Sequence, residues 1–236
     1  MRIYQNALEM IKEVERDLAE MGVRYQSYSV QDKIVKDDHD YETMELSGYA
    51  YKLVASEAGF DLLDSMLRYK KDEEFVTWAK AEADERLYPP VGRNPGKAWR
   101  KRGEFWKPFM RNGYFSYTYV ERWNEQIGYI LKELCDRPTT RQAIMTMYDR
   151  HQDMMNWGGL DRVPCSLTYQ FLIRGDALHC IYSMRSCDFV NFFQADVYCT
   201  AQLQYWLCEQ LDLRIGTFTH FIGSLHAFRK DLEGVF

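Results

Sequence analysis

Two strand-like runs in the second half of the chain constrain its fold most. Residues 166–173 and 178–184 are rich in aromatic and aliphatic side chains, and only residues 174–177, RGDA, separate them. A four-residue connection that contains glycine between two such runs is typical of a β-hairpin. A helical pattern follows over 196–211, and a last strand-like run follows over 215–222. Strands and helices mixed in this order predict an α+β fold.

The rest of the chain carries further patterns of secondary structure. Apolar residues recur every three or four positions over 3–21 and predict a helix that ends before Gly22. Residues 44–54 alternate as in a strand, and the central Gly48 indicates a bulge. The other expectations are helices over 73–83 and 120–135, a strand over 143–148, and irregular segments over 28–43, 88–96 and 151–164.

Length and composition limit the organisation of the molecule. The 236 residues include 46% hydrophobic and 15% aromatic residues, which is enough to build a core. Because no linker or repeat divides the chain, we expect a single domain over 1–236. The net charge of −5 argues against a nucleic-acid partner. No apolar run approaches the roughly 18 residues of a membrane span, so no membrane partner is expected.

The cysteines and the N-terminal segment indicate a compartment. The six cysteines contain no CxxC pair, and residues 1–17 carry acidic side chains without the apolar core of a signal peptide. Reduced thiols in the cytoplasm are therefore expected. A metal site has no support in the sequence.

Cys165 is the first candidate for chemistry. It follows Pro164 where a loop meets a strand, and Arg185 follows the partner strand of the hairpin. A nearby arginine favours the nucleophilic thiolate, whereas most free cysteines are inert core residues. His226, placed after the last strand, and Asp196, at the expected N-cap of a helix, have equally ordinary structural explanations. Residue types alone therefore indicate a thiol enzyme only weakly.

The order of these residues is more informative than their types. The chain contains PC-x4-QF-x2-R from Pro164, then RS-x-D from Arg185, then GS-x-H from Gly223. This ordered set resembles the thymidylate synthase superfamily, most clearly over 141–228. The resemblance implies a thymidylate synthase-like α+β fold, in which a mixed sheet packs with helices. It also implies a homodimer with composite active sites and a pyrimidine nucleoside monophosphate as ligand.

The resemblance implies a role for each matching residue at the nucleotide. Cys165 resembles the nucleophile that adds to carbon 6 of the pyrimidine, which makes carbon 5 reactive. Arg185 and Ser186 resemble phosphate ligands. Arg141 resembles the arginine that reaches the phosphate from the partner subunit, and Tyr119 resembles the tyrosine beside the attacked carbon.

The resemblance also implies residues around the base, the sugar and the folate. Asp188 and His226 resemble members of the polar network at the base and sugar. Trp99 and Asp188 resemble residues of the folate site. The glutamate that orders water near position 4 of the base is assigned to Glu74, which precedes the apolar run FVTWA. Glu73 and Glu82 stay open as alternatives, because the loop before Trp99 differs in length.

Asp196 bears on the choice of base. It occupies the position, eleven residues after Arg185, at which thymidylate synthases carry an asparagine that pairs with uracil. A carboxyl group can accept a hydrogen bond from the amino group of cytosine and, when protonated, donate one to ring nitrogen 3. Aspartate here, together with the GSLH run at 223–226, resembles the phage deoxycytidylate hydroxymethylases.

This branch implies hydroxymethylation of dCMP with 5,10-methylenetetrahydrofolate as co-substrate and no metal. Water, instead of hydride, then completes the reaction, and the short stretch after Phe228 favours water because synthases continue further. A dCMP methylase on the same scaffold and a non-catalytic nucleotide-binding relative are the alternatives.

Four positions depart from the family pattern. The histidine after the catalytic cysteine is Ser166, and the tyrosine that binds the sugar hydroxyl is Phe228, which cannot form that hydrogen bond. A glycine near the folate ring is Phe192, and a second partner-subunit arginine is Gln142.

Overall fold

A mixed seven-stranded sheet organises the protein. The computed structural model describes residues 1–236 except 31–32, 55–58, 90–93, 155–161 and 233–236. The strands of the main path follow the order β1-β5-β9-β8-β7-β6, and β2 pairs with β5. The pairs β8–β9 and β1–β5 are parallel, and the others are antiparallel. The strands are Arg2–Tyr4 (β1), Val23–Gln26 (β2), Glu42–Val54 (β5), Ile144–Thr146 (β6), Ser166–Arg174 (β7), Ala177–Asp188 (β8) and Arg214–Phe228 (β9).

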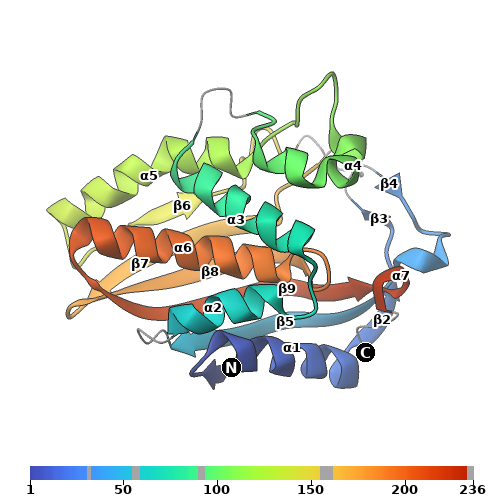
Figure 1. Ribbon diagram of the computed structural model, residues 1–236, viewed down its shortest axis with the longest axis horizontal. Coiled ribbons are helices and arrows are strands. Elements are labelled where there is room, and N and C mark those ends of the chain that lie inside the picture. The colour runs from blue at the N-terminus through green and yellow to red at the C-terminus, as the bar shows by residue number, and fades with distance from the viewer. Residues whose placement is uncertain (31–32, 55–58, 90–93, 155–161, 233–236) are drawn as a thin grey trace.

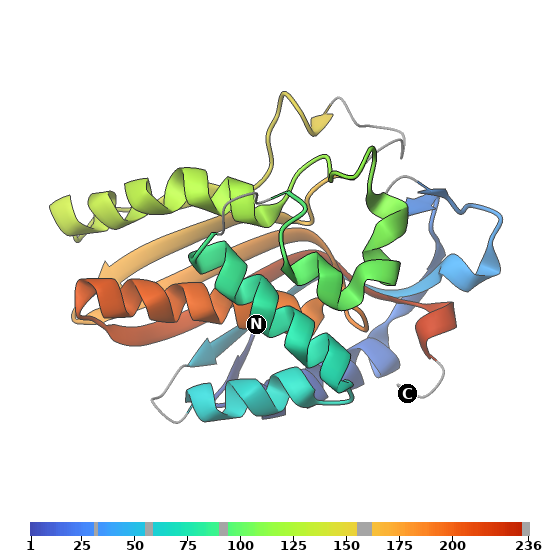
Figure 2. The same cartoon turned by 45° about the horizontal axis from the view of Figure 1, so that its top comes forward.

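Helices lie in front of this sheet in the views of Figures 1 and 2. The helix α6 packs on β8 and β9, α1 packs on β5, and α5 packs on β6. The helix α3 crosses over α6 and α5 as an outer layer (Figure 2). The helices are Ala7–Met21 (α1), Gly59–Arg68 (α2), Glu73–Leu87 (α3), Gly103–Trp106 (α4), Tyr119–Asp136 (α5), Phe193–Leu211 (α6) and Arg229–Leu232 (α7).

The core lies between the helices and one face of the sheet. In β8, Leu178, Cys180, Tyr182 and Met184 are buried, whereas the residues between them are only half-buried. This alternation is expected for a strand whose faces differ in cover, because successive side chains point to opposite sides. The mixed sheet packed with helices confirms the predicted α+β fold class.

Each predicted helix is a helix in the structure and each predicted strand is a strand, but several begin or end at other residues than predicted. The helix α6 begins at Phe193, so Asp196 is its fourth residue and the predicted N-cap position is wrong. The strand β9 continues to Phe228, so His226 lies within the last strand and not after it. The pairing of β5 with β9 runs through Gly48 without a shift, so the predicted bulge is wrong. Gly48 instead adopts a positive φ of 69°, which glycine accepts at little cost.

Several short elements lie in segments expected to be irregular or given no assignment. The segment 28–43 contains the hairpin of Ser29–Val30 (β3) and Lys33–Ile34 (β4), and the 3-10 turn His39–Tyr41 (η1). The helix α2 and the turns Ala98–Arg102 (η2) and Lys107–Phe109 (η3) have no counterpart in the sequence prediction. Parts of the predicted irregular segments 88–96 and 151–164, namely 90–93 and 155–161, lie outside the described residues.

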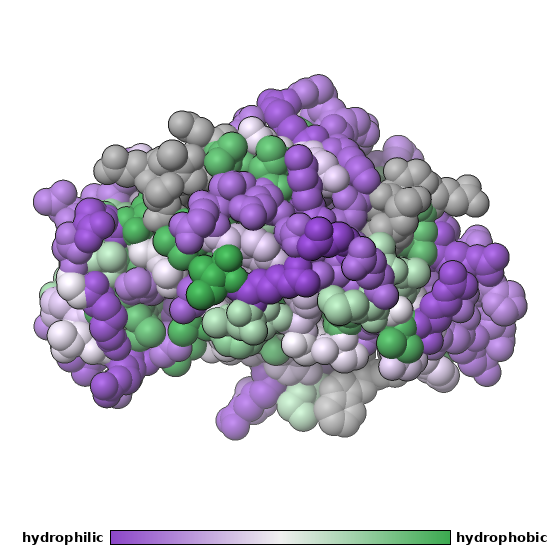
Figure 3. Space-filling model, turned by 90° about the horizontal axis from the view of Figure 1, so that it is seen from below, coloured by the Kyte–Doolittle hydropathy of each residue, from purple (hydrophilic) through white to green (hydrophobic). Residues whose placement is uncertain are grey.

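The surface around α1 and the β1–β5 edge is mainly hydrophilic. Figure 3 shows this side, seen from below, with small apolar groups between polar side chains. Ile3, Met21 and Val23 are exposed large apolar residues of this region. No helix in the described part of the chain is long and apolar enough to cross a membrane.

Candidate functional site

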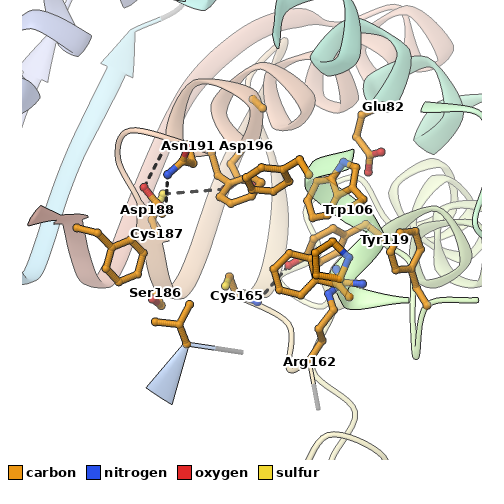
Figure 4. A pocket seen from close by; sticks show the side chains of 18 of the residues that line it. Glu82, Trp106, Tyr119, Arg162, Cys165, Ser186, Cys187, Asp188, Asn191 and Asp196 are labelled. Carbon is orange, nitrogen blue, oxygen red and sulfur yellow. Dashed lines mark hydrogen bonds between the residues drawn. The ribbon is translucent and has the colours of Figure 1, made fainter. Parts of the chain in front are cut away.

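A large cavity lies beside the carboxyl end of β8 and the start of α6. Its volume of about 680 Å³ falls within the usual range of ligand pockets. Residues of α3, the start of α5, the η2–η3 segment, β3, β4, the start of β5 and the carboxyl end of β9 also line it. Figure 4 shows part of this lining. Eight residues singled out from the sequence line this cavity: Trp99, Tyr119, Cys165, Arg185, Ser186, Asp188, Asp196 and His226.

Cys165 lies immediately before β7, against the side chain of Arg185. The Nη2 atom of Arg185 lies 3.7 Å from Sγ of Cys165 and donates a hydrogen bond to it. The same guanidinium donates to the carbonyl oxygens of Pro164 at 2.8 Å and Val163 at 2.9 Å. The backbone N–H of Arg185 donates to the carbonyl oxygen of Cys165 at 2.9 Å. Arg185 therefore fixes the loop that carries the thiol.

Burial and positive charge act in opposite directions on the Cys165 thiol. Burial raises the pKa of Cys165, and the positive charges of Arg185 and Arg162 oppose this rise. The carboxyl groups of Asp196 and Asp188 add to the rise. Because the net effect is upward, the resting residue is a thiol at neutral pH. The two arginines are the groups that favour the thiolate.

The start of α5 places Tyr119 against the nucleophile. Thr118 caps the helix by accepting a hydrogen bond from the N–H of Glu121, whose carboxylate accepts the N–H of Thr118 at 3.0 Å. This reciprocal capping box fixes the entry of the chain into the helix. Tyr119 is the first helical residue, and its hydroxyl accepts the N–H groups of Cys165 at 3.1 Å and Ser166 at 3.2 Å.

Asp196 brings a buried carboxyl group into the cavity. It is 9% exposed, and its Oδ2 lies 4.0 Å from Sγ of Cys187. Burial raises the pKa of Asp196 to about 7, with Glu82 and Asp188 acting in the same direction and Arg86 against them. Glu82 lines the same cavity from α3, and Arg86 donates to its carboxylate at 2.9 Å. The two carboxyl groups therefore have different partners at one end of the cavity (Figure 4).

Asp188 and His226 are neighbours across the parallel strands β8 and β9. The Oδ1 of Asp188 accepts the N–H groups of Val190 at 3.1 Å and Asn191 at 3.0 Å, and its Oδ2 accepts the side chain of Asn191 at 3.0 Å. Asp188 thus shapes the loop that leads into α6. Among the described residues, no three His, Cys, Asp or Glu side chains are grouped so that they could hold a metal ion.

Aromatic side chains form the wall opposite these polar groups. Glu85 on α3 is buried and accepts the N–H groups of Lys97 and Ala98, which anchors η2 and the neighbouring Trp99 at the cavity. The ring of Phe192 lies 5.6 Å from Trp106 between centroids. The cavity therefore has a polar end and an aromatic wall, as ligands with charged groups and flat rings require.

A match to a family model identifies the family of this chain. The model described as thymidylate synthase matches residues 60–236, three quarters of the chain. The chain belongs to the thymidylate synthase family. A Methanococcoides burtonii protein named "Putative thymidylate synthase" is 30% identical over 127 residues, which is 51% of this chain and 57% of that protein. The thymidylate synthase of Buchnera aphidicola is 24% identical over 173 residues, 72% of this chain and 56% of the relative.

Solved thymidylate synthases share the fold. The thermostable thymidylate synthase A of Bacillus subtilis superposes with a TM-score of 0.71 at 17% identity, covering 98% of this chain and 83% of that one. The T4 phage enzyme gives 0.68 at 18% identity, covering 94% and 77%. These structures confirm the expected thymidylate synthase-like fold. The chain spans little more than half the length of the curated relatives that it matches.

The family's one-carbon chemistry uses a pyrimidine nucleotide and methylenetetrahydrofolate.

Three positions that depart from the thymidylate synthase pattern form other contacts in this structure. Ser166 is buried, and its hydroxyl lies 2.6 Å from that of Tyr182. Phe228 packs edge-on against Tyr41 and His226. Phe192 joins the aromatic wall.

Two predicted residues lie outside the cavity. Glu74 is exposed near the start of α3, where the cap at Asp72 begins the helix, and it does not line the cavity. The alternative Glu82, two turns further along α3, does line the cavity. Arg141 is exposed before β6, and its carbonyl oxygen accepts the side chain of Gln170. Within one chain Arg141 therefore does not reach the cavity.

Sequence reasoning missed other residues of the cavity. Arg86 and Arg162 both line it, as does Trp106. Arg86 sits four residues after Glu82, and that spacing on a helix was an available signal for a paired charge. The segment 98–109 shows no helical period, so no sequence pattern brought Trp106 to the cavity.

Proposed function

We propose that the protein transfers a hydroxymethyl group to carbon 5 of dCMP. The observation that carries this proposal is Asp196, a buried carboxyl whose pKa of about 7 keeps it largely protonated below neutral pH and about half protonated at pH 7. It lines the same cavity as Cys165. Membership of the thymidylate synthase family supports the broader reaction class, which is one-carbon transfer.

Asp196 matches cytosine and not uracil. Cytosine presents an acceptor at ring nitrogen 3 and an amino donor at position 4, and a protonated carboxyl offers one donor and one acceptor. With the carboxyl proton on the oxygen that faces nitrogen 3, uracil would set its own donor at nitrogen 3 against that proton. A mismatched polar pair in a buried site discriminates strongly, because both groups lose their hydrogen bonds.

Asp196 also assists the addition of the nucleophile. When the thiolate of Cys165 forms its bond to carbon 6, the π electrons between carbons 5 and 6 move onto carbon 5 and through carbon 4 to nitrogen 3. The Asp196 proton donated at nitrogen 3 stabilises that charge. Arg185 and Arg162 favour the thiolate that starts the addition. Carbon 5 then forms a bond to the methylene carbon of the co-substrate. Loss of the carbon-5 proton and of tetrahydrofolate leaves an exocyclic methylene group on the ring. Water adds to that group, giving up one proton to solvent, and the thiolate is expelled from carbon 6.

The one-carbon unit comes from 5,10-methylenetetrahydrofolate. The aromatic wall formed by Trp99, Trp106 and Phe192 fits the flat ring of such a co-substrate, and the buried Nε1 of Trp99 has no partner among the described residues. Trp99 and Asp188 are the residues we assign to it. Phe192 narrows this part of the cavity where the family carries glycine, and a volume of about 680 Å³ is still open.

Glu82 and His226 complete the proposed substrate contacts. We assign Glu82 to the water near the amino group of the base, because its carboxylate lies in the cavity beside Asp196 and not on the exposed helix face. His226 and Ser186 line the cavity from β9 and β8. We assign Ser186 and Arg185 to the phosphate and His226 to the sugar.

A second copy of the chain completes the site in this proposal. Ile181, Ser183 and Phe221 alternate with buried core residues along β8 and β9, so they lie on the sheet face away from the core. Phe221 is 45% exposed. Arg185 follows Ser183 by two residues in β8 and therefore lies on the same face. The exposed Phe221 and the position of Arg141 outside the cavity support the proposed homodimer, in which Arg141 would serve the site of the other chain.

Mass spectrometry of the product tests the function. We expect dCMP incubated with the protein and methylenetetrahydrofolate to gain CH2O, and dUMP and CMP in parallel to remain unchanged. Cys165→Ala should abolish the product. A methylated product would keep the site and replace hydroxymethylase by dCMP methylase. Binding of dCMP without any exchange of its carbon-5 hydrogen would favour a non-catalytic relative.

A further inference from the structure

Arg86 is a buried cation that lines the cavity and has no role so far. It is 5% exposed. Its Nε donates to Oε1 of Glu82 at 2.9 Å, and its guanidinium carbon lies 4.6 Å from the ring centre of Tyr119 and 5.3 Å from that of Trp123. The rings and the carboxylate therefore hold the guanidinium in one orientation.

One nitrogen of this guanidinium is left without a partner. Nη1 of Arg86 is buried and forms no hydrogen bond with any described residue. A buried N–H of a charged group without an acceptor costs free energy, so such groups are nearly always satisfied by protein, water or ligand. Because Arg86 lines the cavity, the acceptor is expected to come from the cavity side.

Asp196 lines the same cavity and forms no hydrogen bond with Arg86. The two residues influence each other's charge, yet no ion pair joins them within 4 Å. Arg86 thus pairs directly with one carboxylate, Glu82, and only at a distance with the other. The two carboxyl groups therefore have unequal surroundings: one is bonded to a buried cation and the other is not.

We propose that Arg86 is a positioning residue that divides the roles of the two carboxyl groups. It holds the Glu82 side chain in place by direct hydrogen bonding, and its Nη1 binds a water in the cavity that faces Asp196. Asp196, without a cation of its own, keeps the proton that reads nitrogen 3 of cytosine. This inference rests on the proposed function and adds a specificity-determining residue to it.

The charged and titratable groups around Asp196 determine whether each substitution raises or lowers its pKa. Arg86 is the cation that lowers its pKa, and Glu82 and Asp188 raise it. The other titratable groups coupled to Asp196 come from five elements: Tyr51 of β5, Tyr119 of α5, Tyr169 of β7, Tyr182 and Cys187 of β8, and Cys199 of α6, with Cys165 before β7. Removal of Arg86 therefore raises the pKa of Asp196, and removal of the Glu82 charge lowers it.

Binding of dCMP across pH, measured by calorimetry on the full chain without folate, tests the inference. With a pKa of about 7, wild-type affinity should fall about fifteenfold between about pH 7 and about pH 8.5, as Asp196 ionises. For Arg86→Ala the fall should be about fourfold, since loss of the cation raises the pKa by about one unit. Glu82→Gln should move the fall to lower pH.

Arg122 provides a matched control. It is also a buried arginine over an aromatic ring, Tyr117, but both terminal nitrogens donate to Asp153, at 2.7 Å and 2.9 Å. Arg122→Lys should leave the pH profile of dCMP binding unchanged. Arg86→Ala removes a buried side chain. If Arg86→Ala does not fold, the pH profile of Glu82→Gln alone tests the role of Arg86.

The outcomes separate the inference from the proposed function. A wild-type protein that binds dUMP better than dCMP, or dCMP with no fall above neutral pH, would overturn both. A wild-type fall near pH 7 that neither Arg86→Ala nor Glu82→Gln moves would overturn the role of Arg86 alone. Opposite displacements by the two variants, with no displacement by Arg122→Lys, are the supporting result.

Discussion

At the scale of single residues, Asp196 carries the most information because its type and its surroundings point the same way. An aspartate four residues into a helix is ordinary, and its N–H simply continues the helix by donating to Phe192. The carboxyl, however, is buried beside Cys187 and lacks a cation at contact distance. A protonated carboxyl is the form that such surroundings favour.

Replacing Asp196 by asparagine tests the base preference. The amide offers an acceptor to nitrogen 3 of uracil and a donor to its oxygen at position 4, so Asp196→Asn should favour dUMP over dCMP. We expect the ratio of kcat/KM for the two nucleotides to change by about a hundredfold or more. Release of the carbon-5 hydrogen from labelled nucleotides measures this ratio. An unchanged ratio in a folded variant would contradict cytosine reading by Asp196.

Residue identities were predictable from sequence order, but positions along a helix were not. Cys165, Arg185 and Asp196 keep fixed spacings, and the structure brings them to one cavity. Glu74 and Glu82 lie on the same helix, about 12 Å apart along its axis. Which of them meets the cavity depends on how α3 crosses α6, a tertiary contact that no local pattern records.

At the scale of elements, the capping box of α5 connects helix stability to the site. Tyr119 begins the helix, and its hydroxyl holds the backbone of Cys165 and Ser166. A frayed first turn would release Tyr119. The N-terminal end of α5 therefore acts on the nucleophile as well as on folding.

Thr118→Ala should separate these two effects. Loss of the cap is expected to cost about 1 kcal/mol of unfolding free energy, and to lower kcat for release of the carbon-5 hydrogen more than it changes KM. Thr140→Ala, which removes hydroxyl bonds to Glu133 and Gln142 beyond the other end of α5, is the control. It should lower stability without changing kcat, as denaturant unfolding and turnover would show. An equal loss of kcat in both variants would refute the link.

Elements with a strong period were predicted and those without one were not. The helix over 120–135 appears as Tyr119–Asp136, because its apolar face packs on β6 and α3. The η2–η3 segment forms because Glu85 binds its backbone and because Phe105 and Trp106 pack on Phe192. Both causes are contacts with distant parts of the chain.

At the scale of the whole molecule, the proposed homodimer bears on the position of Arg141. Arg141 is exposed and lies outside the cavity, although its place in the sequence resembles a phosphate ligand. Arg185 lies on the sheet face that also carries the exposed Phe221. Contact between two copies of this face would give each site one arginine from each chain, as isologous packing requires.

Mixing two inactive variants tests this arrangement. Arg141→Ala should lose activity because the partner's site lacks a phosphate ligand, and Cys165→Ala should lose it because its own site lacks the nucleophile. In a mixed dimer one site combines both defects, and the other combines the intact Cys165 with the intact Arg141. We therefore expect activity to return when the two proteins are unfolded together and refolded. One of the two sites in each mixed dimer should then be active. If Arg141 served its own chain instead, every site would carry one defect and mixing would restore nothing.

Phe221→Lys in both chains should prevent this recovery of activity, because a charge on the shared face opposes dimer formation.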